Sequence, residues 1–240
     1  MPEAELSQVR VDYPRLVPGR LIRRYQRFLA EVELDQGDTV TAHCPNSGSM
    51  LGCLEPGAPV RLSHQPRPGR RTAYTWEMIR IKRHWVGINT LMPNRLAARA
   101  AELGALPLFR GATQVRREVK VSDRSRVDLM VLTPEGELYV EVKNVTLVQG
   151  GHARFPDAVT SRGARHLREL MELAEAGKRA AMLYLVQRAD ARDFAPARDI
   201  DPTYAELFDQ ARGRGVEMVV VRARVGPRGV RLERTLPLAP

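Results

Sequence analysis

The spacing of apolar residues changes once along this chain of 240 residues, and that change constrains the fold most. From residue 14 to about residue 88, short apolar runs alternate with turn residues such as DQGD, PNSGS and EPGAP. Strands so closely spaced predict a small β-barrel or sandwich, for which a closed OB-type barrel is one solution. From Asn94 onward, helical and strand patterns alternate. We therefore expect two domains, over residues 1–88 and 89–240.

The C-terminal half combines two kinds of pattern. Helices are indicated for NRLAARAAELGAL, with Gly104 as its C-cap, for the stretch from Thr160 or Ser161 to Gly177, and for DPTYAELFDQARG, which Asp201 opens. Strands are indicated for TQVRREVKV, SRVDLMVL, ELYVEVKNV, AAMLYLVQ and GVEMVVVRARV. This order predicts a mixed sheet with helices packed against it, so the chain is expected to be of mixed α/β (α+β) class.

One predicted hairpin carries charged residues in a pattern that suggests chemistry. Side chains alternate faces along a strand, so Glu141 and Lys143 point the same way. If the turn of TPEG centres on Pro134 and Glu135, Asp128 lies opposite Glu141 on the same face. A slip of one residue would send the side chains to opposite faces. The predicted register therefore brings two carboxylates and one ammonium together.

Two neighbouring carboxylates repel each other, and a hard divalent cation relieves that repulsion. Mg²⁺, or Mn²⁺ in its place, takes oxygen ligands from one or two carboxylates and keeps several waters. Lys143 would orient the attacking water or stabilise developing charge. Glu118, on the polar side of the preceding strand, is a further candidate carboxylate, although it equally fits an exposed charge ladder. The simpler alternative for the whole set is a cross-strand ion pair on a solvated face.

The charge balance favours a polyanionic partner. Lys and Arg number 38 against 28 Asp and Glu, which gives a formal net charge of +10 and a pI near 10.3. A proteome biased toward arginine would produce the same excess. Two sets of residues are candidate nucleic-acid contacts: Arg23, Arg24, Tyr25 and Arg27, which combine charge with stacking, and Arg162 with His166, which lie one turn apart near a helix start. Exposed basic faces are the alternative for both sets.

Other features narrow the location. No apolar run approaches the roughly 18 residues of a membrane span. The first residues, MPEAELSQVRVDYPRL, contain acids and no continuous apolar stretch, unlike a secretory signal. A cytoplasmic protein with no membrane partner is therefore expected, and the sequence makes no prediction about its oligomeric state. The two cysteines, Cys44 and Cys53, match no common zinc spacing.

Several long motifs resemble one known family. RLIRRYQRFLAEVEL, HCPNSGSMLGCLEPG, YTWEMIRI, WVGINTLMPN, SRVDLMV, YVEVKNVTL, FPDAVTSRGARHLREL and IDPTYAEL are similar to the sugar fermentation stimulation protein A (SfsA) family over nearly the whole chain. This resemblance implies an OB-like N-terminal domain and a C-terminal domain of the PD-(D/E)xK nuclease fold. Asp128 matches the D of that motif, Glu141 and Lys143 match its E-x-K, and Glu118 matches a further acidic position.

The resemblance also implies DNA binding and a link to the regulation of sugar-utilisation genes. Three hypotheses follow. The first is a Mg²⁺-dependent or Mn²⁺-dependent DNA endonuclease, with RNA as an alternative substrate. The second is a non-catalytic DNA-binding regulator of sugar-utilisation genes. The third is a small-molecule-binding protein that uses the backbone donors of the PNSGS loop.

Overall fold

The N-terminal part of the computed structural model, which describes residues 6–69, 71–122 and 125–239, is a small barrel. Its six-stranded sheet has the order β4-β3-β2-β5-β6-β7, and an additional parallel pairing of β4 with β6 closes it. The strands are β2 (Leu16–Tyr25), β3 (Leu29–Leu34), β4 (Thr39–His43), β5 (Pro59–His64), β6 (Tyr74–Ile81) and β7 (His84–Gly87). The prediction of an OB-like barrel is confirmed.

The C-terminal part is built on a seven-stranded sheet. Its order is β1 (Arg10–Asp12), β16 (Gly229–Thr235), β15 (Glu217–Gly226), β13 (Arg179–Val186), β10 (Gly136–Val145), β9 (Ser125–Thr133) and β8 (Gln114–Ser122). β13 runs parallel to both of its neighbours, whereas the remaining pairs are antiparallel. The sheet is mixed, as the sequence pattern predicts. A separate three-stranded sheet comprises β11 (Leu147–Gln149), β12 (His152–Phe155) and β14 (Asp193–Pro196).

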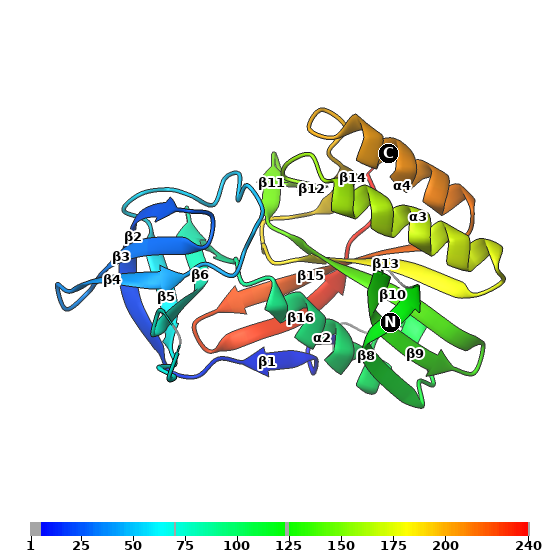
Figure 1. The fold of residues 1–240 in the computed structure, drawn as a ribbon, viewed down its shortest axis with the longest axis horizontal. Coiled ribbons are helices and arrows are strands. Elements are labelled where there is room, and N and C mark those ends of the chain that lie inside the picture. Colours follow the sequence, from blue (N-terminus) through cyan, green and yellow to red (C-terminus); the bar gives the residue numbers. More distant parts are fainter. Residues whose placement is uncertain (1–5, 70, 123–124, 240) are drawn as a thin grey trace.

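Helices cover both faces of the seven-stranded sheet. The α2 helix (Leu91–Glu102) and the short η1 turn (Pro107–Phe109) pack in one apolar core, while α3 (Ser161–Glu175) and α4 (Pro202–Gly213) pack in the other. Along β10, Val140 faces the α2 core and Tyr139 faces the α3 core, as strand alternation requires. Figure 1 shows the barrel in blue and cyan on one side, and the larger sheet with α3 and α4 on the other.

The helix ends follow from local chemistry. The Thr160 side chain accepts a hydrogen bond from Gly163 N at the start of α3, and the Asp201 side chain accepts one from Tyr204 N at the start of α4. Gly104, just beyond the end of α2, has a φ of 58°, which suits glycine. These caps agree with the predicted boundaries, although α2 begins at Leu91 rather than at Asn94.

The domain prediction needs one correction at its beginning. Residues 10–12 do not join the barrel; they form β1, which pairs with β16 at the edge of the C-terminal sheet. Leu6 and Val9 are buried in the same core as α2. Residues 6–12 therefore pack on the C-terminal domain, and the chain enters the barrel at β2.

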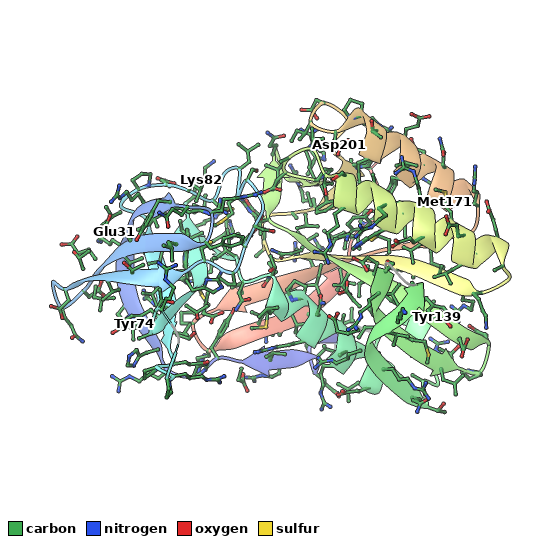
Figure 2. All side chains as sticks on the ribbon, in the orientation of Figure 1. Glu31, Tyr74, Lys82, Tyr139, Met171 and Asp201 are labelled. Atoms are coloured by element: carbon green, nitrogen blue, oxygen red, sulfur yellow. The ribbon has the colours of Figure 1, made fainter. Side chains whose placement is uncertain are left out.

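The barrel and the larger domain are joined by main-chain and side-chain contacts. Val86 forms an antiparallel bridge with Arg188, and Gly87 N donates a 3.3 Å hydrogen bond to the Gln187 carbonyl. Figure 2 shows side chains filling the space around the elements, with the labelled Glu31 and Tyr74 on the barrel and Met171 and Asp201 on the helical side of the larger domain.

Candidate active site

The predicted register of the β9–β10 hairpin is confirmed. Thr133 pairs with Gly136 across the Pro134–Glu135 turn, and the ladder continues to the Leu129–Val140 pair. The next residues in that register are Asp128 and Glu141. The short turn fixes the register of the two strands, because a two-residue loop is too short to allow one strand to shift against the other.

The main-chain pairing of the β9–β10 hairpin ends just before Asp128. Here the Asp128 side chain, rather than a main-chain carbonyl, accepts the hydrogen bond from the next N–H group of β10. Its Oδ2 accepts a 2.7 Å hydrogen bond from Val142 N, and its Oδ1 accepts a 2.7 Å hydrogen bond from Asn94 Nδ2 of α2. The alternation of β9 breaks here, since Val127 packs in the α3 core and Leu129 in the α2 core. Asp128 is thus held at the point where the two strands separate.

Glu141 and Lys143 lie on the α3 side of the sheet, where they meet His166. Lys143 Nζ donates a 2.7 Å hydrogen bond to Glu141 Oε1 and lies 2.9 Å from His166 Nδ1. His166 Nδ1 is also in close contact with Glu141 Oε1. Arg162 Nε donates a long 3.4 Å hydrogen bond to His166 Nε2. Because arginine only donates, Nε2 accepts from Arg162, while Nδ1 faces both the Lys143 ammonium and the Glu141 carboxylate.

The two carboxylates have different electrostatic surroundings. Burial, and then the neighbouring Glu141 charge, raise the pKa of Asp128 to about 6, against the lowering effects of Val142 N, Lys143 and Asn94. Burial alone would raise the pKa of Glu141, but Lys143 and His166 outweigh it, so this pKa lies below its usual value. Glu141 is therefore already compensated, whereas Asp128 lacks enough positive charge around it.

These residues open into a cavity of about 680 Å³ that both domains line. Of the residues predicted from sequence to act in catalysis or nucleic-acid binding, the cavity gathers seven: Asp128, Glu141, Lys143, Arg24, Arg27, Arg162 and His166. The PNSGS loop contributes Asn46, Ser47, Gly48 and Ser49 from the barrel side. The structure thus unites the barrel arginines, the loop and the hairpin residues in one place.

Three of the predicted site residues, Glu118, Arg23 and Tyr25, do not line the cavity. Glu118 is exposed and has a φ of 52°, a left-handed conformation that interrupts the regular strand between the pairs Arg117–Leu129 and Val119–Val127. It agrees with the alternative of an exposed charge. Arg23 donates a 2.6 Å hydrogen bond to Glu31 and lies over the ring of Tyr25, and neither residue lines the cavity.

Sequence reasoning missed other contributors. Asn94 contacts Asp128 from a helix 34 positions earlier in the chain, and Asn144 and Arg154 also line the cavity. The sequence signal for Asn94 was its place in LMPN, just inside a predicted helix start, but nothing in that signal indicates a partner. Contacts between distant elements are visible only in the folded chain.

The candidate ligands for a metal are the two carboxylates. Within residues 6–69, 71–122 and 125–239, no group of three or more His, Cys, Asp or Glu residues is arranged to hold an ion. A site with two carboxylates and several waters is typical of Mg²⁺, whereas zinc is usually bound by Cys and His side chains. The raised pKa of Asp128 indicates that too little positive charge surrounds this carboxylate, and a bound cation would supply that charge. Cys44 and Cys53 are buried free thiols, and burial raises the pKa of both.

Comparisons with known proteins agree with this architecture. Residues 22–88 match the model of the SfsA N-terminal OB domain, and residues 91–229 match that of the sugar fermentation stimulation protein RE domain. The chain is 53% identical to a sugar fermentation stimulation protein homolog of Geobacter sulfurreducens, with 93% of this chain and 96% of that protein covered. A homolog from a Synechococcus strain is 48% identical, with 89% of each chain covered.

A solved structure has the same fold. It is described as Pyrococcus furiosus SfsA in complex with Ca²⁺, and it is 27% identical to this chain with a TM-score of 0.88. The comparison covers 96% of this chain and 98% of that one. Among the helices that the structure describes, none is long and apolar enough to cross a membrane.

Proposed function

This chain belongs to the sugar fermentation stimulation protein (SfsA) family, and from that premise we propose a metal-dependent nuclease that cleaves phosphodiester bonds in the cavity between its domains. Family membership and the OB domain support a DNA-binding protein. The observation that carries the catalytic part is the convergence of Asp128, Glu141 and Lys143 on one cavity lined with arginine.

Mg²⁺ or Mn²⁺ would be held by Asp128 and Glu141. When bound, such an ion polarises a phosphoryl oxygen and lowers the pKa of a coordinated water. The raised pKa of Asp128 supports this assignment, because a carboxylate that lacks positive charge is a good site for a cation. The P. furiosus relative is described as a complex with Ca²⁺, which takes the same oxygen ligands as Mg²⁺.

The basic residues of the cavity have roles that follow from the hydrogen-bond donors on their side chains. Lys143, whose side chain is 12% exposed, offers an ammonium beside the carboxylates to the charge that develops on the phosphate. His166, through its contact with Glu141, fixes the orientation of that carboxylate. Arg24, Arg27, Arg154 and Arg162 place guanidinium groups along the cavity and would offer phosphate oxygens the donors that remain. Some of their donors are already used, since Arg24 and Arg27 donate to main-chain carbonyls, Arg162 contacts His166, and Arg154 is paired with Asp199. A pure binding protein has no use for buried acids facing a polyanion.

A cleavage assay tests the proposal. Purified protein is incubated with single-stranded and double-stranded DNA in Mg²⁺, in Mn²⁺ and in chelator. We expect metal-dependent cleavage that falls at least 100-fold in both Asp128→Asn and Lys143→Ala, whereas Lys178→Ala, at an exposed lysine paired with Glu137, retains it. Glu118→Gln should also retain activity, because that side chain lies outside the cavity.

Two other outcomes would change the conclusion. Salt-sensitive binding without cleavage in either metal would favour a non-catalytic DNA-binding regulator, including one of sugar-utilisation genes. If neither DNA nor RNA bound at low salt, both functions would be excluded, because phosphate contacts dominate nucleic-acid affinity under that condition.

A further inference from the structure

The reactive groups lie at the bottom of the cavity rather than on a surface. Glu141 is 4% exposed, and the Lys143 side chain is 12% exposed. The cavity volume of about 680 Å³ falls in the range of small-molecule sites and has room for a few nucleotides of one strand. A B-form duplex is stiff and keeps its bases stacked inside, so a flexible single strand enters a recessed site more readily than a duplex does.

One wall of this cavity is fixed across the two domains. The loop of residues 45–50 from the barrel is held at its start by Thr90 Oγ1, which donates a 2.6 Å hydrogen bond to the Pro45 carbonyl. At its end, Met50 N donates a 2.7 Å hydrogen bond to the Asp157 carboxylate, and Ser49 Oγ donates a 2.6 Å hydrogen bond to the Asp157 carbonyl. These bonds hold the loop of residues 45–50 against the larger domain.

The packing around this wall leaves little freedom for rearrangement. A Cβ atom added to Gly48 would lie 3.1 Å from Asp157 Oδ1 and 3.1 Å from Asn46 Oδ1. Asn46 Nδ2 in turn donates a 3.2 Å hydrogen bond to the Ile88 carbonyl at the domain junction. The loop is therefore seated directly on the C-terminal domain, and the mouth of the cavity is set by the fold.

Exposed apolar side chains accompany the charged lining of the cavity. Val159, which lines it, is 76% exposed. Phe28, 46% exposed, and Leu51, 47% exposed, do not themselves line the cavity, but they follow the lining residues Arg27 and Ser49 by one and two positions. We call Phe28, Leu51 and Val159 the apolar rim. Exposed apolar side chains next to arginines suit a ligand that carries both phosphate groups and aromatic rings with accessible faces.

The turn that presents Phe28 has an unfavourable backbone. Gln26 and Arg27 have φ values of 47° and 60°, a region that residues with a Cβ rarely occupy. Such conformations cluster at ligand-binding sites, where the surrounding structure enforces them. Here the strained turn places Arg27 in the cavity lining and leaves Phe28 exposed beside it.

From these observations we infer that the cavity binds an unpaired nucleic-acid strand, with its phosphates on the cavity arginines and its bases against the apolar rim, and excludes an intact duplex. Bases present their faces to a protein only when they are unpaired and unstacked, and aromatic side chains then stack on them. The inference rests on the proposed function and specifies its substrate class. It covers DNA and RNA strands alike, since the cavity chemistry that carries it is shared.

Fluorescence anisotropy in Ca²⁺ tests this inference without requiring cleavage. The probes are labelled 20-nucleotide strands of DNA and of RNA, a blunt duplex of the same length, and a duplex with a single-stranded tail. We expect the strands and the tailed duplex to bind at least ten-fold more tightly than the blunt duplex. Phe28→Ser should weaken strand binding roughly ten-fold. Leu132→Ser, a matched loss of an exposed apolar side chain (38% exposed) outside the cavity, should leave it unchanged.

The outcomes separate this inference from the proposed function. If the blunt duplex binds as tightly as the strands, the preference for an unpaired strand is wrong, while nucleic-acid binding stands. An equal effect of Phe28→Ser on strand and duplex would remove the base-stacking role of the rim. Absence of binding by every probe at low salt would overturn the proposed function itself. A difference between the DNA and RNA arms identifies which strand the cavity prefers.

Discussion

Replacement of Asp128 by asparagine should change the pH dependence of stability in the metal-free protein. Asparagine keeps the size of the side chain and an oxygen that accepts from Val142 N, but it cannot ionise. The pKa of Asp128 is raised from 3.8 to about 6 in the folded chain, chiefly by burial. At 1.36 kcal/mol for each pKa unit, ionisation of this carboxyl costs the folded state up to about 3 kcal/mol.

The sign follows from proton binding. A carboxyl whose pKa is higher in the folded state holds its proton more tightly there, so its contribution is full below pH 3.8 and is lost as the pH rises through about 6. The wild-type protein therefore loses up to about 3 kcal/mol through this group between about pH 4 and pH 7, whereas Asp128→Asn loses none. The pH dependence of other groups is common to both proteins and largely cancels in the difference.

Urea unfolding in chelator, followed by circular dichroism from pH 4.5 to pH 8, measures that difference. The free energy of unfolding of Asp128→Asn relative to wild type should rise by about 2 kcal/mol across this range. Asp35→Asn, at an exposed carboxyl in the β3–β4 turn, is the control and should show a constant difference. A constant difference for Asp128→Asn as well would refute the argument that this carboxylate is undercompensated.

Two further predictions concern contacts that support the site. Asn94→Ala removes the 2.7 Å hydrogen bond to Asp128 and should weaken Mn²⁺ binding about 10–100-fold in a calorimetric titration; unchanged affinity would mean that Asn94 does not orient the ligand. Gly87→Ala would place a Cβ 2.2 Å from the Oε1 of the fully buried Gln187 and should lower the free energy of unfolding by about 1–3 kcal/mol. Gly213→Ala, with no atom within 4 Å of the added Cβ, is the control, and equal effects of the two changes on urea unfolding would contradict the close packing at the domain junction.

The hairpin register could be predicted from sequence because its determinants are local. Strand alternation places Glu141 and Lys143 on one face, and the two-residue turn at Pro134 sets a register that runs to the Leu129–Val140 pair, next to Asp128 and Glu141. The barrel and the α3 and α4 helices were predictable for the same reason, since turn residues and caps lie next to the elements that they bound.

Features that depend on distant contacts could not be predicted. β1 has three residues, too few to show alternation, and it is identified only by its pairing with β16. Glu118 follows an alternating pattern in sequence, but in the structure its backbone is left-handed and the residue is exposed outside the cavity. The partnership of Asn94 with Asp128 joins a helix to a strand, and no period in the sequence encodes it.

The central claim is that Asp128 and Glu141 together hold a divalent cation in the cavity between the two domains. An anomalous difference map from a crystal soaked in Mn²⁺ tests this directly. A peak is expected in contact with a carboxylate oxygen of each residue, at about 2.1 Å as for Mg²⁺. A map with no peak there, while Glu141 keeps its contacts with Lys143 and His166, would contradict it.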